Sequence, residues 1–151
     1  MNPTDEKSWI NRAVVSTKLN QPEKAILDLD TALKVNPKNA FGYSQRGIAL
    51  NNLGQYDKAL ADCNKAIALK DDFGYPYNTR GAILFAKKDL NGALKDFTRA
   101  IELMPRNTES LSNRGVVLYQ LKRKDEACAD WSKAAELGDQ EAAKYLKDNC
   151  L

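Results

Sequence analysis

The sequence predicts an all-α fold built from four consecutive helix hairpins. Two observations support this prediction: apolar residues recur with helical spacing, and a longer pattern that spans a pair of helices recurs four times along the chain of 151 residues. The apolar share of 43%, with only 8 Gly and 5 Pro, is typical of a folded helical protein and argues against disorder. We therefore expect a single domain, residues 1–151, in which each hairpin packs against the next.

The clearest copy of the pattern covers residues 74–107. Apolar residues recur there with helical spacing on both sides of a short polar turn at residues 87–89. Gly81 and Ala93 are small and lie where two antiparallel helices must approach closely, whereas Phe97 fills the space between the helices. One such hairpin cannot bury its own apolar surface, so neighbouring copies are required.

The pattern fits the chain four times without a gap. The repeats are residues 6–39, 40–73, 74–107 and 108–141. The first helices are expected near residues 5–19, 40–53, 74–87 and 108–121. The second helices are expected near residues 22–35, 56–69, 90–103 and 124–137. A capping helix at about 139–148 follows, because Tyr145 falls where a fifth repeat would place its first core residue.

Local residues support these helix ends. Pro22 suits the first turn of a helix, and Asp89 can cap the helix that follows it. Gly54 and Gly138 suit left-handed backbone just after a helix.

The recurring positions identify a known type of repeat. In the clearest copy they are Tyr77, Gly81, Leu84, Ala93, Phe97, Ala100 and Pro105. This series resembles the tetratricopeptide repeat, in which an aromatic residue, Leu-Gly, Tyr, Ala, Phe, Ala and Pro follow one another over roughly 34 residues. The resemblance covers residues 6–141 and implies a right-handed α-solenoid of four helix hairpins with a C-terminal capping helix. The chain departs from the family pattern where Asp71 and Asp139 replace the closing proline, and where Arg replaces the usual Leu in all four repeats.

Catalytic groups are scarce in this sequence. The chain has no His, which removes Ser-His-Asp and Cys-His sites, and it has no Gly-rich phosphate loop. Carboxylates are common, but Asp28, Asp62, Asp96 and Asp130 are repeated helix positions rather than a catalytic pair. We predict that the protein is not an enzyme and uses neither a cofactor nor a metal.

An arginine and an aspartate recur together in every repeat, at one constant spacing. The arginines are Arg12, Arg46, Arg80 and Arg114, and the aspartates are the four named above. We expect ion pairs, either within a repeat or from an aspartate to the arginine of the next repeat. The alternative is that the arginines point into an open groove and bind an anion.

The three cysteines allow two interpretations. Cys63 aligns with Phe97, so it is expected to be a small core residue. Cys128 faces the capping helix, just beyond which Cys150 lies, so these two are expected to be close. Their odd number favours reduced thiols, a disulfide between Cys128 and Cys150 is the alternative, and no clustered spacing suggests a metal site.

The net charge and the length of the apolar runs limit which kinds of partner the protein is expected to have. The 23 Lys and Arg against 20 Asp and Glu leave a net charge of +3, too small to indicate nucleic-acid binding, and the basic run 122–124 is interpreted as a solvated turn. No apolar run approaches the roughly 20 residues needed to cross a membrane. We expect no nucleic-acid or membrane partner and a cytoplasmic location, which a signal segment or a larger chain outside these residues would change.

The resemblance also implies a function. First helices of the family line a concave groove that receives an extended peptide or a helix, so we expect a non-enzymatic protein-interaction scaffold. The expected groove residues are Asn11, Phe41, Ser44, Gln45, Tyr75, Asn78, Thr79, Phe85, Asn113 and Tyr119. Amides suit a peptide backbone and aromatic rings supply anchoring area. The basic clamp of chaperone-binding members is absent, because residues such as Gln45 and Tyr75 take its positions. The alternative function is a structural module that self-assembles through its groove or ends into a homo-oligomer.

Overall fold

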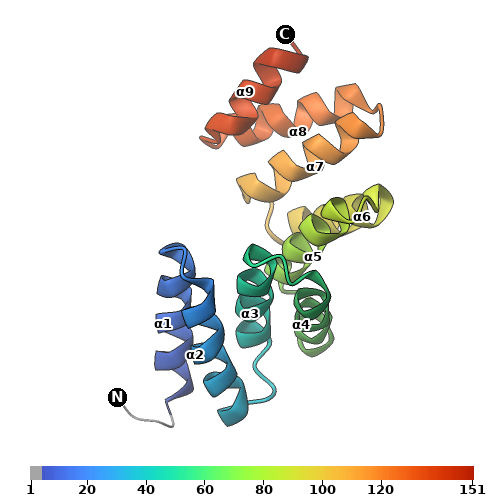
Figure 1. The fold of residues 1–151 in the computed structure, drawn as a ribbon. Coiled ribbons are helices and arrows are strands. Elements are labelled where there is room, and N and C mark those ends of the chain that lie inside the picture. The colour runs from blue at the N-terminus through green and yellow to red at the C-terminus, as the bar shows by residue number, and fades with distance from the viewer. Residues whose placement is uncertain (1–4) are drawn as a thin grey trace. The chain divides into compact units, whose positions relative to one another are not determined.

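The computed structural model describes residues 5–151, which form nine α-helices and no strand (Figure 1). The helices are α1 (Glu6–Lys18), α2 (Pro22–Val35), α3 (Ala40–Asn52), α4 (Tyr56–Leu69), α5 (Gly74–Ala86), α6 (Leu90–Leu103), α7 (Thr108–Gln120), α8 (Lys124–Glu136) and α9 (Gln140–Asn149). The predicted all-α fold of helix hairpins is confirmed, and every expected helix end lies within one residue of the observed one. None of the helices in residues 5–151 is both long and apolar enough to cross a bilayer.

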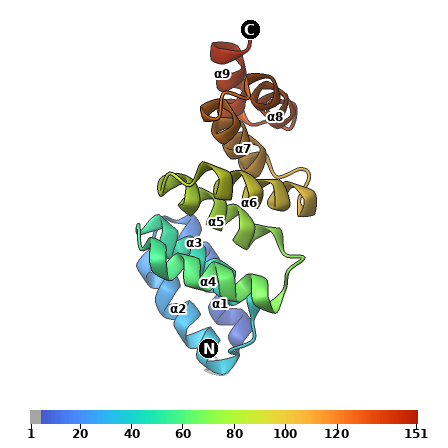
Figure 2. The same ribbon diagram turned by 90° about the vertical axis from the view of Figure 1, so that its right-hand side faces the viewer.

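The contacts divide the chain into two compact units at Thr79, inside α5. The first unit, described from residue 5 to 79, contains α1 to α4 and the start of α5; the second unit is Arg80–Leu151. In the first unit α1 packs on α2, α2 on α3, and α3 on α4 (Figure 2). In the second unit α6, α7, α8 and α9 pack on one another in that order. The single domain expected for residues 1–151 stays a prediction.

Side-chain caps begin several of the helices. Asn39, Asp89, Asn107 and Asp139 each accept a hydrogen bond from the backbone amide three residues later, at 2.7, 2.9, 2.7 and 2.9 Å. These bonds satisfy amides that have no partner inside the helix. Asp89 was the cap expected from the sequence, and Pro22 stands at the start of α2 as expected.

The turn inside each hairpin has one residue with left-handed backbone. Gly54 has φ of +69° and Gly138, after α8, has +98°, as expected. The position of Gly54 is occupied in the other repeats by Asn20, Lys88 and Lys122, with φ of 55°, 67° and 63°. Left-handed backbone costs an L-residue about 1–2 kcal/mol, so the tight turn is retained in those repeats at some expense of stability.

The core of each hairpin is a small residue on the first helix that faces a larger residue on the second. The pairs are Ala13 with Leu29, Gly47 with Cys63, Gly81 with Phe97, and Gly115 with Trp131. The four larger residues are at most 1% exposed. A Cβ atom added at Gly115 would lie 2.4 Å from Nε1 of Trp131, so the indole fits only because this helix position has no side chain.

Candidate functional site

Three aromatic side chains meet in the first unit. Phe41 lies in the first turn of α3, Phe73 directly precedes α5, and Tyr75 lies in the first turn of α5. The ring centroids of Phe41 and Phe73 are 6.0 Å apart, and those of Phe73 and Tyr75 are 5.5 Å apart. Phe41 is 40% exposed and Tyr75 is 44% exposed. Together these residues, named here the aromatic cluster, form a continuous and partly exposed apolar surface.

Local bonds position this cluster. The Asn39 cap fixes the start of α3, so that Phe41 falls in its first turn. The hydroxyl of Tyr77 donates a hydrogen bond to the carbonyl oxygen of Asp71 at 3.2 Å, which ties the loop carrying Phe73 to α5. Phe73 was not among the residues expected from the sequence, because only first-helix positions were considered.

The polar residues predicted beside the cluster differ in exposure. Asn11 is exposed and Gln45 is half-buried. Ser44 is fully buried, and Asn78 and Thr79 are 5% and 6% exposed. The hydroxyl of Thr79 donates to a backbone carbonyl oxygen of its own helix at 3.1 Å. Ser44 is buried because α3 packs on α1, α2 and α4, which cover much of its circumference. In the first unit, Asn11 and Gln45 are therefore the accessible polar members of the predicted set.

The other three predicted residues belong to the second unit. Phe85 is half-buried and packs against the buried cluster that contains Ala93 and Phe97. Asn113 is half-buried. Tyr119 is 41% exposed, and its ring centroid lies 5.6 Å from that of Trp131. A binding role for these residues stays a prediction.

The repeated arginines and aspartates form ion pairs in all four repeats. In each pair Nε and Nη2 of the guanidinium donate to the two carboxylate oxygens, over distances of 2.6 to 2.8 Å in the last three repeats. Arg12 and Asp28 form the same paired contact in the first repeat. The aspartate side chains are only 5–9% exposed. The prediction of ion pairs is confirmed, and all four lie within a repeat rather than between an aspartate and the next arginine.

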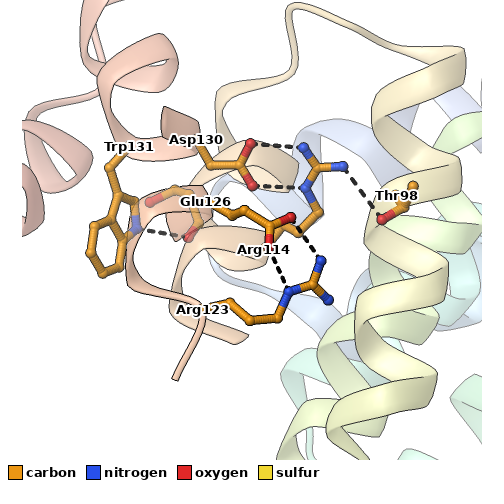
Figure 3. A network of polar contacts seen from close by, with 7 residues as sticks. Thr98, Arg114, Arg123, Glu126, Asp130 and Trp131 are labelled. Carbon is orange, nitrogen blue, oxygen red and sulfur yellow. Dashed lines mark hydrogen bonds and ion pairs between the residues drawn. The ribbon is translucent and has the colours of Figure 1, made fainter. Parts of the chain in front are cut away.

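Two of these arginines also reach the preceding repeat. Nη1 of Arg114 donates to the hydroxyl of Thr98 at 3.4 Å (Figure 3), and Nη1 of Arg46 donates to Asp30 at 2.7 Å. The hydrogen bonds with Asp62 raise the pKa of Arg46 further above its usual value, against the opposing effect of burial. Since these guanidinium groups are occupied by protein acceptors, the structure gives no support to an anion site there.

The basic run at the turn before α8 has local partners. Lys122 holds the left-handed turn position, and Arg123 donates two hydrogen bonds, of 2.6 and 2.7 Å, to Glu126 (Figure 3). The hydrogen bond from Arg123 lowers the pKa of Glu126 below its usual value. These side chains are exposed, in line with a solvated turn.

Two of the three cysteines form a disulfide. Cys128 on α8 is bonded to Cys150, which directly follows α9, and their Cα atoms are 5.9 Å apart. The expectation of reduced thiols is therefore wrong for this pair, although the expected proximity is right. Cys63 lies outside this disulfide and is buried, as a core residue should be. Within residues 5–151, no group of three or more His, Cys, Asp or Glu side chains could hold a metal ion.

Comparison with protein families settles the type of repeat. Models of the tetratricopeptide repeat match residues 6–39, 40–73 and 81–122. The chain belongs to the tetratricopeptide-repeat family. A comparison with curated proteins finds no matching sequence.

Solved tetratricopeptide-repeat structures have the same fold. The structure of pilF from Pseudomonas aeruginosa superposes with a TM-score of 0.85 at 20% identity, over 95% of this chain and 66% of that chain. A thermophilic member from Thermus thermophilus gives a TM-score of 0.83 at 22% identity, over 95% and 80%. The first repeat domain of Spaghetti (RPAP3), bound to the HSP90 peptide SRMEEVD, gives 0.72 at 26% identity, over 81% and 97%. Family and neighbours together support a protein-interaction scaffold.

Proposed function

We propose that this chain is a non-enzymatic scaffold that binds a peptide segment of a partner protein at the aromatic cluster. The observation behind the proposal is that Phe41, Phe73 and Tyr75 contact one another while two of the rings leave about two fifths of their surface in solvent. Partly exposed aromatic side chains next to amide groups are typical of binding hot spots. Gln45, one helical turn after Phe41, supplies an amide for a peptide backbone.

The chemistry of the surface favours an uncharged, apolar peptide. RPAP3 is known with SRMEEVD, a peptide that contains two Glu and one Asp. Chaperone-binding members of the family use Lys, Arg and Asn for such a ligand, whereas this chain has Gln45, Tyr75 and Thr79 at corresponding positions. Because these three side chains carry no positive charge, they cannot offset the desolvation of carboxylates. A partner of low charge therefore fits better than an acidic peptide, a nucleic acid or a membrane surface.

The test is a peptide selection followed by measured affinities. Random peptides displayed on phage are selected on the immobilised full chain. The selected peptides are then synthesised with a fluorescent label, and their affinities are measured by fluorescence polarisation. We expect Phe41→Ala and Tyr75→Ala each to weaken binding by about 2 kcal/mol, roughly thirtyfold. Tyr56→Ala is the matched control, because Tyr56 is 37% exposed but lies on the second helix α4, and it should leave affinity unchanged. Circular dichroism verifies that each variant is folded.

Four outcomes would contradict the proposal. Unchanged affinity in both folded cluster variants would place the site elsewhere. A steep fall in affinity with added salt would indicate a charged surface such as residues 122–124. Binding of SRMEEVD as tight as that of the selected peptides would contradict the preference for low charge. A molecular mass that rises with protein concentration, in the absence of peptide binding, would favour the self-assembly alternative.

A further inference from the structure

A crevice in the first unit is lined by residues of α2, α3 and α4 and of the turn between α3 and α4. Its volume is about 550 Å³, within the range of about 300–1,000 Å³ typical of ligand sites. Residues from α2, α3 and α4 line it, and none of the aromatic cluster does. The crevice is therefore separate from the peptide surface proposed above, and the inference drawn from it does not rest on that proposal.

The crevice has an apolar floor. Ile26 from α2, Leu50 from α3, and Leu53, which directly follows α3, line it. Leu50 is buried, whereas Ile26 and Leu53 are half-buried and so leave apolar surface in contact with solvent. Covering that surface with an aliphatic side chain would be favourable, because burial of apolar area removes it from water.

The α2 wall of the crevice carries two carboxylates. Glu23 and Asp30 are separated by two helical turns, so both lie on the same side of α2 with Ile26 between them. The Asp30 side chain is 43% exposed and accepts the Arg46 hydrogen bond through Oδ1. No protein donor in residues 5–151 reaches its Oδ2, and Glu23 is exposed without an ion pair there. Both carboxylates can accept hydrogen bonds from a bound cation.

The corresponding crevice of the second unit is smaller and lacks this wall. It lies two repeats further along the chain and has a volume of about 390 Å³. At equivalent positions of the repeats, the second crevice has Thr98 where the first has Asp30. It also has the ion-paired Arg123 and Glu126 where the first has Gln55 and Lys58. The first crevice is lined by three carboxylates against two cations, whereas the second has two of each. Only the first crevice therefore combines an apolar floor with an excess of negative charge.

We infer that the first-unit crevice is a second docking site, for a partner segment that places a lysine or arginine next to an aliphatic side chain. The aliphatic group covers Ile26 and Leu53, and the cation donates to the carboxylates of Glu23 and Asp30. Charge-assisted hydrogen bonds to a half-exposed carboxylate are stronger than neutral ones, which gives the site its preference for basic residues. An acidic segment would bind less well, because three carboxylates line the crevice against the two cations Arg46 and Lys58. Arg46 is already paired with Asp62 and Asp30.

The experiment is an NMR titration of the isotope-labelled full chain with two synthetic probes. One probe is acetyl-Leu-Arg-Leu-amide and the other is acetyl-Leu-Glu-Leu-amide. We expect the arginine probe to shift the amide signals of Ile26, Asp30 and Leu53, and to leave those of Leu94 and Thr98 in the second-unit crevice in place. The glutamate probe should bind more weakly by about tenfold, because it loses the ion pairs and adds repulsion.

Two variants test the separate parts of the site. Asp30→Asn keeps an acceptor for Arg46 and removes one charge, and it should weaken the arginine probe by about threefold to tenfold. Asp125→Asn is the matched control, since it makes the same charge change on α8, away from the crevice, and it should have no effect. Ala61→Phe fills the crevice mouth and should remove binding of both probes.

The inference fails if the arginine probe produces no shifts. It also fails if the shifts gather at Phe41 and Tyr75, which would assign the probe to the aromatic cluster. Equal weakening by Asp30→Asn and Asp125→Asn would reduce the effect to overall charge and overturn the site.

Discussion

Adding a single methyl group at Gly115 should destabilise the second unit. The new Cβ would lie 2.4 Å from Nε1 and 2.7 Å from Cδ1 of Trp131, well inside contact distance. The indole cannot move away freely, because it is 1% exposed and stacks on Tyr145 at a centroid distance of 5.2 Å. It also donates a hydrogen bond of 3.2 Å to the carbonyl oxygen of Ser112 (Figure 3).

Opposing effects set the size of the change for Gly115→Ala. Alanine is favoured over glycine inside a helix by about 1 kcal/mol. Overpacking of a filled core costs about 1–3 kcal/mol, and an indole N–H displaced from its acceptor costs about 1–3 kcal/mol more. The unfavourable effects exceed the favourable one, so we expect a net loss of about 2 kcal/mol in the free energy of unfolding. At Gly47 the nearest atom to the added Cβ would be the Cys63 sulfur at 3.1 Å, and the next is the Ala59 carbonyl oxygen at an ordinary contact distance of 3.5 Å, so Gly47→Ala should be close to neutral.

Replacing Trp131 by leucine should reverse the effect of Gly115→Ala on stability. The first repeat already pairs an alanine with a leucine at these positions, Ala13 and Leu29. In a Trp131→Leu background the room for a methyl group exists, so Gly115→Ala should stabilise the chain by up to about 1 kcal/mol. The assay is urea unfolding followed by circular dichroism for the four members of this cycle, with hydrogen exchange to locate the loss of protection.

The reasoning gives a coupling energy of about 2–3 kcal/mol between Gly115 and Trp131. If Gly115→Ala changes stability equally in both backgrounds, the close contact does not determine the cost. A loss of protection concentrated in the first unit would also refute it, because both residues belong to the second unit.

Three further predictions concern the turns, the disulfide and the capping helix. Lys88→Gly and Lys122→Gly should each raise the unfolding free energy by about 1 kcal/mol, because they relieve left-handed backbone, whereas Gly54→Ala should lower it in the same urea assay. Cys150→Ser removes a crosslink with a sequence separation of 22 and should lower stability by about 3 kcal/mol, equal to the effect of a reducing agent on the unsubstituted chain. Burial raises the pKa of Tyr145 above 10.0, so the unfolded state loses the phenolic proton at a lower pH than the folded state does. Stability should therefore fall as the pH rises past 10.0. Tyr145→Phe should reduce this fall when thermal unfolding is measured against pH.

The repeat period explains why the helices could be predicted so closely. A residue that recurs at the same position of every repeat must serve the same packing role each time, which fixes both helices of each hairpin and the pairing of Arg46 with Asp62. The left-handed turn at Lys88 and Lys122 could also have been found, since both align with Gly54. The helix pattern alone did not show it, because a lysine gives no local signal for that conformation.

The binding surface was predicted less completely. Helical position places a residue on one side of a helix, but the neighbouring helices decide how much of that side remains open. Ser44 lies three residues after Phe41 and is buried, whereas Gln45, one residue further, is half-buried. Phe73 was missed because it lies in the loop before α5, where no helical period applies. The Cys128–Cys150 bond could be placed by alignment, but its oxidation state could not.

The constant spacing between each arginine and its aspartate limits how this chain can change length. A residue inserted into a hairpin turn would rotate the aspartate by about 100° around the second helix and leave two partly buried charges without partners. Insertions are better tolerated in the loops between repeats. The loop before α3 is an exception, because Asp30 and Arg46 form an ion pair across it with the same spacing in sequence. Gain or loss of a whole repeat keeps every pair within its own hairpin. The length of this chain is therefore expected to change by whole repeats rather than by single residues in the turns.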